Sequence, residues 1–188
     1  DLTSIPVTDS ENRLVGIITI DDIIDILEEE TTEDIEKMAA IVPTEKPYLK
    51  LSILEIYKSR IPWLLLLMIS ATFTGKIIQH YEESLAAYVI LTSFIPMLMD
   101  TGGNAGGQAS VTIIRGLSLN EIKLKDIFKV IFKEFRVSIL IGITLGITNF
   151  FKLLIIDKVS ILVALVVCLT LFITLILAKI IGCSLPIL

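Results

Sequence analysis

The feature that most constrains this chain is a series of long apolar runs in its second half. Three of them, residues 61–75, 137–151 and 159–178, approach or reach the roughly 17–25 residues that a helix needs to cross a bilayer. The mean hydropathy of +0.82 is high for a soluble domain. These runs predict a polytopic, all-α membrane protein built as a helical bundle.

The membrane part is expected to occupy residues 48–188, with four spans at about 61–81, 84–114, 136–156 and 159–182. Apolar and basic residues are interleaved in residues 48–60, which predicts a helix on the membrane surface. This helix would turn into the bilayer at Pro62, with Trp63 at the interface.

Charge is divided unevenly along the chain. Residues 1–36 hold twelve carboxylates and one arginine, a net charge of −11, whereas the remainder holds nine carboxylates and fifteen lysines and arginines, a net charge of +6. An acidic cluster of this kind repels itself unless cations or a partner neutralise it. Divalent cations are therefore expected partners, and nucleic acid is not.

The same charges predict orientation. Residues 115–136 carry six lysines and arginines, whereas the loop at 79–84 carries Glu82 and Glu83 and no basic residue. Basic loops stay on the cytoplasmic side of a membrane. We therefore expect a multi-pass protein of the plasma membrane whose acidic N-terminal part is cytoplasmic.

Residues 1–27 have the pattern of soluble protein. Two β-rich runs at 4–8 and 14–20 flank a polar turn, and a helix capped by Thr19 or Asp21 follows. A hairpin and a helix are too small to stand alone. The run Ile5-Pro6-Val7 and the later LVGIITIDD, residues 14–22, resemble the closing half of a CBS domain.

This resemblance implies a cytoplasmic β-β-α tail and a nucleotide as one candidate ligand. In CBS domains a Thr or Ser and an Asp near the strand-to-helix junction often contact phosphate and ribose. Thr19 and Asp22 occupy that kind of position, so ATP is a possible cofactor here.

An acidic connecting helix and linker are expected over residues 21–47. Nine carboxylates lie between residues 21 and 36, and the first basic residue is Lys37. The run is either a solvated helix face or a cation sensor, because Mg²⁺ is commonly held by a few carboxylates while it keeps several waters. The candidate sensor residues are Asp21, Asp22, Asp25, Glu30, Glu33 and Asp34.

The second span contains the least lipid-like segment, residues 96–110. Gly102, Gly103, Gly106 and Gly107 permit the helix to unwind or bend. They also form two small-xxx-small pairs, 102 with 106 and 103 with 107, which are typical of close helix packing. The glycines alone leave both interpretations open.

Polar residues in the same segment favour a pore. Asp100, Asn104 and Gln108 recur every four residues, so they share one face if the segment stays helical. A carboxylate inside a span is by default a functional-site hypothesis. The pattern predicts a polar lining suited to a hydrated hard cation.

The run TGGNAGGQAS, residues 101–110, followed by IIRGL, residues 113–117, resembles the signature of MgtE-type magnesium transporters. The resemblance implies a homodimer of five-span subunits with a pore on the dimer axis, closed by cytoplasmic Mg²⁺ through a plug helix at about 21–40. The chain would then hold the end of the second CBS domain, the plug helix and spans one to four, with an acidic fifth span to follow. Gly107 and Val111 depart from the family pattern.

The function expected from these residues is gated Mg²⁺ transport, with Mg²⁺ as both substrate and regulator. The candidate pore residues are Asp100, Thr101, Gly102, Gly103, Asn104, Gly107 and Gln108. One alternative is a carrier or channel for Mn²⁺ or Co²⁺, and another is a membrane-anchored CBS sensor that transports nothing. An enzyme is not expected, because the sequence shows no nucleophile with a base, no Cys and His metal set and no phosphate loop.

Overall fold

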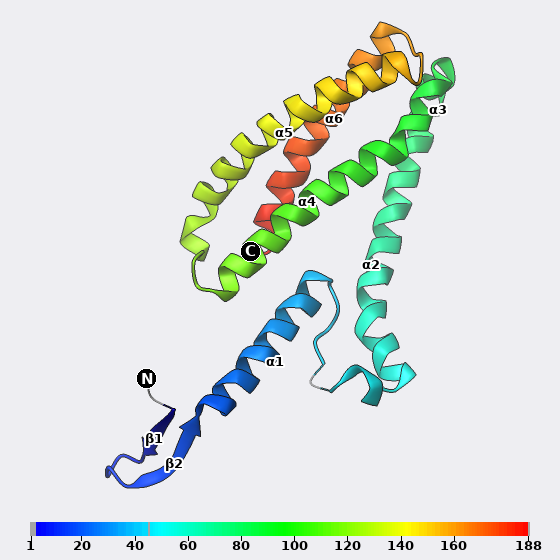
Figure 1. Ribbon diagram of the computed structural model, residues 1–188. Helices are drawn as coiled ribbons and strands as arrows, with labels where there is room; N and C mark the ends of the chain where they lie inside the picture. The colour runs from blue at the N-terminus through cyan, green and yellow to red at the C-terminus, as the bar shows by residue number, and fades with distance from the viewer. Residues whose placement is uncertain (1–2, 45, 188) are drawn as a thin grey trace. The chain divides into compact units, whose positions relative to one another are not determined.

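The computed structural model describes residues 3–44 and 46–187 (Figure 1). The chain forms two compact units, Asp1–Met68 and Ile69–Leu188, and the boundary falls inside a long helix. Residues 1, 2 and 188, at the ends of the predicted CBS-like and membrane segments, and residue 45 in the predicted linker lie outside the described residues. A short hairpin followed by helices confirms the expected fold class.

The first unit opens with an antiparallel hairpin of β1 (Ser4–Thr8) and β2 (Leu14–Thr19). The turn is held by Asp9, whose carboxylate accepts hydrogen bonds from the backbone N–H groups of Glu11 and Arg13 at 2.8 and 2.9 Å. Asn12 takes the left-handed conformation there, with φ of 59°, which asparagine tolerates better than most residues.

Helix α1 (Ile20–Met38) begins directly after the hairpin. Thr19 is its N-cap: the Thr19 hydroxyl accepts a hydrogen bond from the Asp22 N–H at 3.4 Å, and the Asp22 carboxylate accepts one from the Thr19 N–H at 2.7 Å. This reciprocal arrangement satisfies two backbone donors at the helix start. Of the two predicted caps, Thr19 is therefore confirmed.

The predicted surface helix at 48–60 is not a separate element. Residues Tyr48–Lys50 form a short 3₁₀ turn, and α2 (Ile53–His80) then runs without interruption through Pro62. A proline inside a helix removes one hydrogen bond and can kink the helix without ending it. The helical pattern on both sides of Pro62 is strong enough to continue across it.

The second unit contains the rest of the helices: α3 (Glu82–Ala87), η2 (Val89–Phe94), α4 (Ile95–Ser118), η3 (Leu124–Asp126), α5 (Ile127–Ile155) and α6 (Ile161–Ser184). The predicted span at 84–114 is divided among three of these elements. Its break lies at Tyr88, which has φ of −138° and ψ of 64°. The four glycines do not unwind the helix, because α4 continues through them. An intact helix keeps its backbone hydrogen bonds inside the segment, as a membrane requires.

Three described helices are long and apolar enough to cross a membrane: Ile53–His80, Leu124–Ile155 and Ile161–Ser184. Helix α4 has 24 residues, about 36 Å at the usual rise of an α-helix, so its length also suits a span. Because α4 contains glycines and polar side chains, it is less apolar than these three helices.

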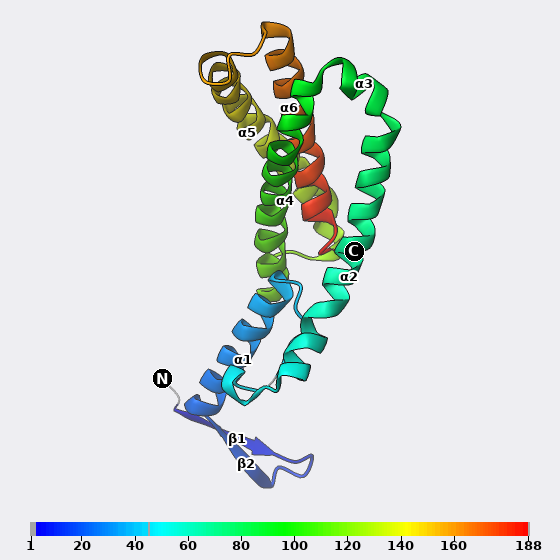
Figure 2. The ribbon, with the colours of Figure 1, turned by 90° about the vertical axis from the view of Figure 1, so that its right-hand side faces the viewer.

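Helix α6 is the centre of the second unit, with α4 and α5 packed against it (Figure 2). Helices α4 and α6 run in the same direction, and α5 runs in the opposite one. Their buried side chains form three successive clusters, which contain Phe94 with Leu153 and Val163, then Ala105 with Leu171 and Leu175, and finally Ala109 with Ile113 and Cys183. Side chains from all three helices thus contribute to the buried clusters.

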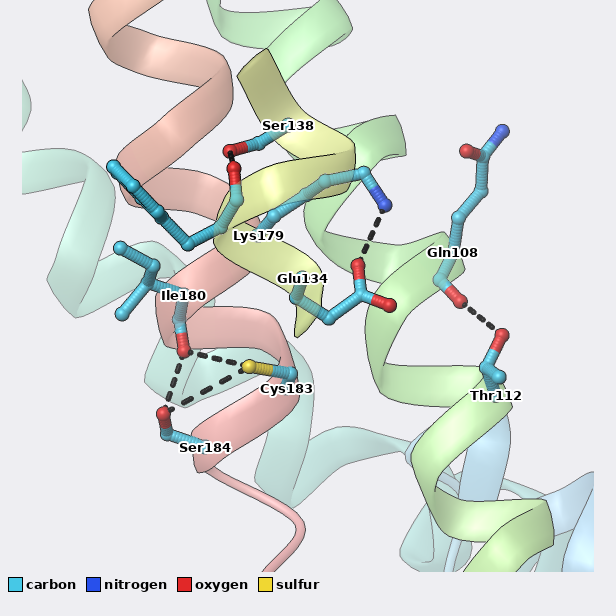
Figure 3. A network of polar contacts seen from close by, with 9 residues as sticks. Gln108, Thr112, Glu134, Ser138, Lys179, Ile180, Cys183 and Ser184 are labelled. Carbon is cyan, nitrogen blue, oxygen red and sulfur yellow. Dashed lines mark hydrogen bonds and ion pairs between the residues drawn. The ribbon is translucent and has the colours of Figure 1, made fainter. Parts of the chain in front are cut away.

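An ion pair lies inside this core. The ammonium nitrogen of Lys179 in α6 is 3.0 Å from a carboxylate oxygen of Glu134 in α5, and their side chains are only 6% and 15% exposed (Figure 3). Lys179 is the single charged residue in the α6 sequence. A charge at this depth is costly unless a partner compensates it. The pair therefore fixes the register between α5 and α6.

We predict that Glu134→Gln and Lys179→Met each destabilise the full-length protein by about 3–5 kcal/mol, because either change leaves the other charge buried and unpaired. The double variant Glu134→Met/Lys179→Met should recover most of the loss. Thermal unfolding in detergent measures this. Lys129→Met, which breaks an exposed ion pair with Asp126, should cost less than about 1 kcal/mol. A double variant no more stable than the single ones would contradict the prediction.

Candidate functional site

Helix α4 has two different faces. One is buried, and it contains Gly102, Ala105, Ala109, Ile113 and Gly116. The other is exposed and carries the polar residues of the segment together with two glycines: Asp100, Gly103, Asn104, Gly107, Gln108 and Thr112. The single helix therefore separates packing residues from polar ones.

Gly102 and Gly106 pack against α6. A Cβ added to Gly182 in α6 would clash with the carbonyl oxygen of Gly106, and one added to Gly106 would lie 3.0 Å from the carbonyl oxygen of Ala178. Ala178 and Gly182 are themselves four residues apart, so each helix presents small residues to the other and the two backbones touch. For this pair of glycines the packing interpretation is correct.

Gly103 and Gly107 have a different environment. Apart from the nearby backbone of α4 itself, no atom of the described residues lies within 4 Å of a Cβ added to either residue. They border a groove of about 420 Å³ between α4 and α6, with Met99 at one end and Gly182 on the opposite helix. Within the described residues, the second pair of glycines therefore leaves space beside the polar stripe.

The structure gathers five of the seven predicted pore residues on the exposed face: Asp100, Gly103, Asn104, Gly107 and Gln108. The other two lie elsewhere. Gly102 is buried against α6, and the Thr101 hydroxyl, which is partly buried, donates a hydrogen bond to the Met97 carbonyl at 2.7 Å. A helix that presents carboxylate and carboxamide groups cannot leave that face in hydrocarbon, so water or protein must cover it.

The predicted sensor residues lie along α1 and are not all in one place. Asp25, Glu30 and Glu33 border a hollow of about 610 Å³, together with Glu28, Glu29, Glu36 and Lys46. Asp21 and Asp22 lie nearer the helix start, and Asp34 is buried. Within residues 3–44 and 46–187, no three His, Cys, Asp or Glu side chains are close enough to hold one metal ion.

Two of the sensor candidates already have partners. Lys37 forms an ion pair with Glu33 and donates a hydrogen bond to its carboxylate, and this hydrogen bond raises the pKa of Lys37. The hydrogen bond from the Thr19 side chain lowers the pKa of Asp22. The stability that this bond gives is present above the ordinary aspartate pKa, about 3.9, and is lost as pH falls through the lowered value. Thr19 and Asp22, the predicted nucleotide contacts, thus serve the helix cap.

The pair of Glu134 and Lys179 is not among the residues predicted from the sequence. Figure 3 shows it beside α4, where Thr112 donates a hydrogen bond to the Gln108 carbonyl at 2.8 Å. One feature of the sequence indicates such a pair: Lys179 is a lone lysine near the end of α6, the most apolar of the three long helices. Such a lysine requires a buried acid, and its partner lies 45 residues earlier in the chain.

Comparison with known proteins gives matches at both ends of the chain. The family model of MgtE, described as a divalent cation transporter, matches residues 95–188, and the CBS domain model matches residues 1–29. The sequence is 40% identical to the magnesium transporter MgtE of Thermus thermophilus over 146 residues, which cover 78% of this chain and 32% of the relative.

Two further relatives are magnesium transporters MgtE of Bacillus subtilis, 43% identical over 146 residues, and of Enterococcus faecalis, 31% identical over 151 residues. These matches cover 76% and 79% of this chain, and 31% and 32% of the relatives. The chain spans about a third of the length of the curated relatives it matches. The two resemblances found in the sequence are confirmed.

The two environments of the glycines predict opposite responses to an added methyl group. Gly182→Ala should lower the thermal stability of the full-length protein, by about 1–3 kcal/mol, because its Cβ meets the Gly106 carbonyl. Gly103→Ala should leave stability unchanged or raise it, since the space is open and alanine favours helix. Melting in detergent compares them, and equal losses would show that both glycines pack.

Proposed function

The chain belongs to the MgtE family of divalent cation transporters, and from that premise we propose that the exposed face of α4 lines a pathway for Mg²⁺. The observation that carries the proposal is the polar stripe of Asp100, Asn104 and Gln108 in a membrane protein. A family of transporters is not one of enzymes, so the expectation that the protein is no enzyme is confirmed.

The proposed mechanism holds the ion through its waters. Mg²⁺ loses its hydration shell reluctantly, so the carboxamides of Asn104 and Gln108 accept hydrogen bonds from that shell and do not replace it. The open positions at Gly103 and Gly107 let the shell approach the helix backbone. Asp100 adds a negative potential that concentrates cations along the stripe.

Magnesium is proposed as the substrate because the three relatives are all named magnesium transporters. Carboxylate, carbonyl and water ligands also suit Mn²⁺, so selectivity must come from the hydration shell. Flux into liposomes in the presence of Mn²⁺ or Co²⁺ tests this, and strong preference for either metal over Mg²⁺ would make that metal the substrate.

We also propose the family's assembly, a homodimer with α4 as an additional span. The length of α4 and the groove of about 420 Å³ beside its polar stripe support this proposal. The basic residues between α4 and α5 favour placing that connection, and with it the N-terminal acidic part, in the cytoplasm of a plasma membrane protein.

Regulation is proposed to reside in α1. Its carboxylates repel one another when little Mg²⁺ is present, and bound Mg²⁺ would favour a compact, closed arrangement through its higher affinity for that arrangement. The acidic hollow between α1 and the linker supports this role for Asp25 and Glu30. The Thr19 and Asp22 side chains form the helix cap, and no nucleotide is assigned to them.

Changes on the polar stripe should abolish transport without unfolding the protein. We predict that Gly103→Val reduces Mg²⁺ flux in liposomes by at least about tenfold, and that Asn104→Ala does the same, because one blocks the backbone and the other removes a polar ligand. Asp100→Asn should reduce flux less. Gly146→Val, at an equally open glycine in α5, is the matched control. Normal flux in Gly103→Val would refute the proposed lining.

Neutralising the hollow should weaken inhibition by cytoplasmic Mg²⁺. We predict that Asp25→Asn/Glu29→Gln/Glu30→Gln shifts half-inhibition to several-fold higher Mg²⁺ and leaves the full-length channel more open, because the closed arrangement loses its bound ions. Flux across a series of Mg²⁺ concentrations measures the shift. Glu82→Gln/Glu83→Gln, in the first turn of α3, serves as control. Unchanged inhibition in the triple variant would make the acidic run a solvated face.

A further inference from the structure

The η3 turn and the first half of α5 carry two exposed stripes that the proposed pathway does not use. One stripe is basic and contains Lys125, Lys129, Lys133 and Arg136; the other is apolar and contains Leu124, Phe128 and Phe132. Residues four apart share a helix face, so the stripes run side by side. Phe128 is 81% exposed and Phe132 62%, which is unusual for phenylalanine unless lipid covers it.

Three of the four basic side chains, Lys125, Lys133 and Arg136, make no ion pair with an acid among the described residues. Lys129 is paired with Asp126 at 3.1 Å, and the one carboxylate nearby in the helix, Glu134, is paired with Lys179. Lys133 and Arg136 make no such ion pair in the part of the chain that the structure describes. The Arg136 guanidinium instead lies 5.9 Å from the centre of the Phe132 ring, where a cation is weakly attracted.

These two cations border a shallow hollow of about 490 Å³. Its other walls are the aliphatic side chains of Val137, Ile139 and Leu140. The hollow therefore has a cationic end and an apolar end, and the apolar end leads into the membrane-spanning part of α5. A matching ligand must combine an anionic head with hydrocarbon, which excludes nucleic acid and free phosphate.

We propose that Lys133 and Arg136 bind the headgroup of an anionic phospholipid whose acyl chains lie along Val137 and Leu140. Arginine suits this task because its planar fork forms paired hydrogen bonds with phosphate oxygens. Basic residues beside a span are typical of sites for acidic lipids.

The test is lipid retention by the full-length protein. The protein is released from nanodiscs of phosphatidylcholine and phosphatidylglycerol in equal parts, and bound lipid is identified by native mass spectrometry. Wild-type protein should retain phosphatidylglycerol in preference to phosphatidylcholine. In Lys133→Gln/Arg136→Gln, apparent affinity should fall about 25-fold, since each cation near a membrane surface contributes about fivefold.

Lys123→Gln/Lys125→Gln is the matched control, because it removes the same charge outside the hollow and should change retention less than about twofold. Glycerophosphoglycerol, the headgroup without chains, should not compete. Equal loss in both double variants, or equal retention of both lipids by wild-type protein, would overturn the proposal. The comparison of lipids on wild-type protein decides the matter even if the variant fails to fold, and neither readout depends on Mg²⁺ flux.

Discussion

Hydrocarbon offers no hydrogen bond and no counter-charge, and the second unit is organised around that constraint. The ammonium of Lys179 is buried in α6 and is compensated by Glu134 from α5. With α5 fixed on one side of α6, the other side receives α4, whose backbone touches α6 at Gly106 and Gly182. The polar stripe of α4 is consequently turned away from the packed core. Its position follows from the two contacts that hold the bundle together.

The glycines of α4 illustrate how a single residue type serves two purposes on one helix. Gly102 and Gly106 remove side chains so that two backbones can meet, whereas Gly103 and Gly107 remove side chains and leave open space. Neither pair interrupts the helix. The helix therefore keeps its internal hydrogen bonds and still presents exposed backbone next to Asn104. In the proposed mechanism, this combination offers a continuous helical wall to an ion that keeps its water.

Sequence patterns predicted the elements better than their partners. Local spacing determines three of the predicted features: Thr19 as a cap, the long apolar helices, and the shared face of Asp100, Asn104 and Gln108. Each depends on residues that are near neighbours along the helix. The pairing of Lys179 with Glu134 spans 45 residues, and the two glycine pairs are equivalent until α6 is placed. Local patterns also failed to predict that α2 continues through Pro62 and that the helix breaks at Tyr88, because propensity is a weak guide to where a helix ends.

The reluctance of Mg²⁺ to lose its waters also bears on the acidic helix α1. Within the described residues no three acidic side chains converge on one point, and Glu33 and Asp22 already have partners in Lys37 and Thr19. A single tight site of several direct carboxylate ligands is therefore absent from this part of the chain. Mg²⁺ that keeps its waters can still be attracted by the dispersed carboxylates around the hollow. In the proposed function, both the sensor and the pathway would then recognise hydrated Mg²⁺. Because binding at each position is weak, closure of the pathway would depend on how many Mg²⁺ ions are bound at the same time.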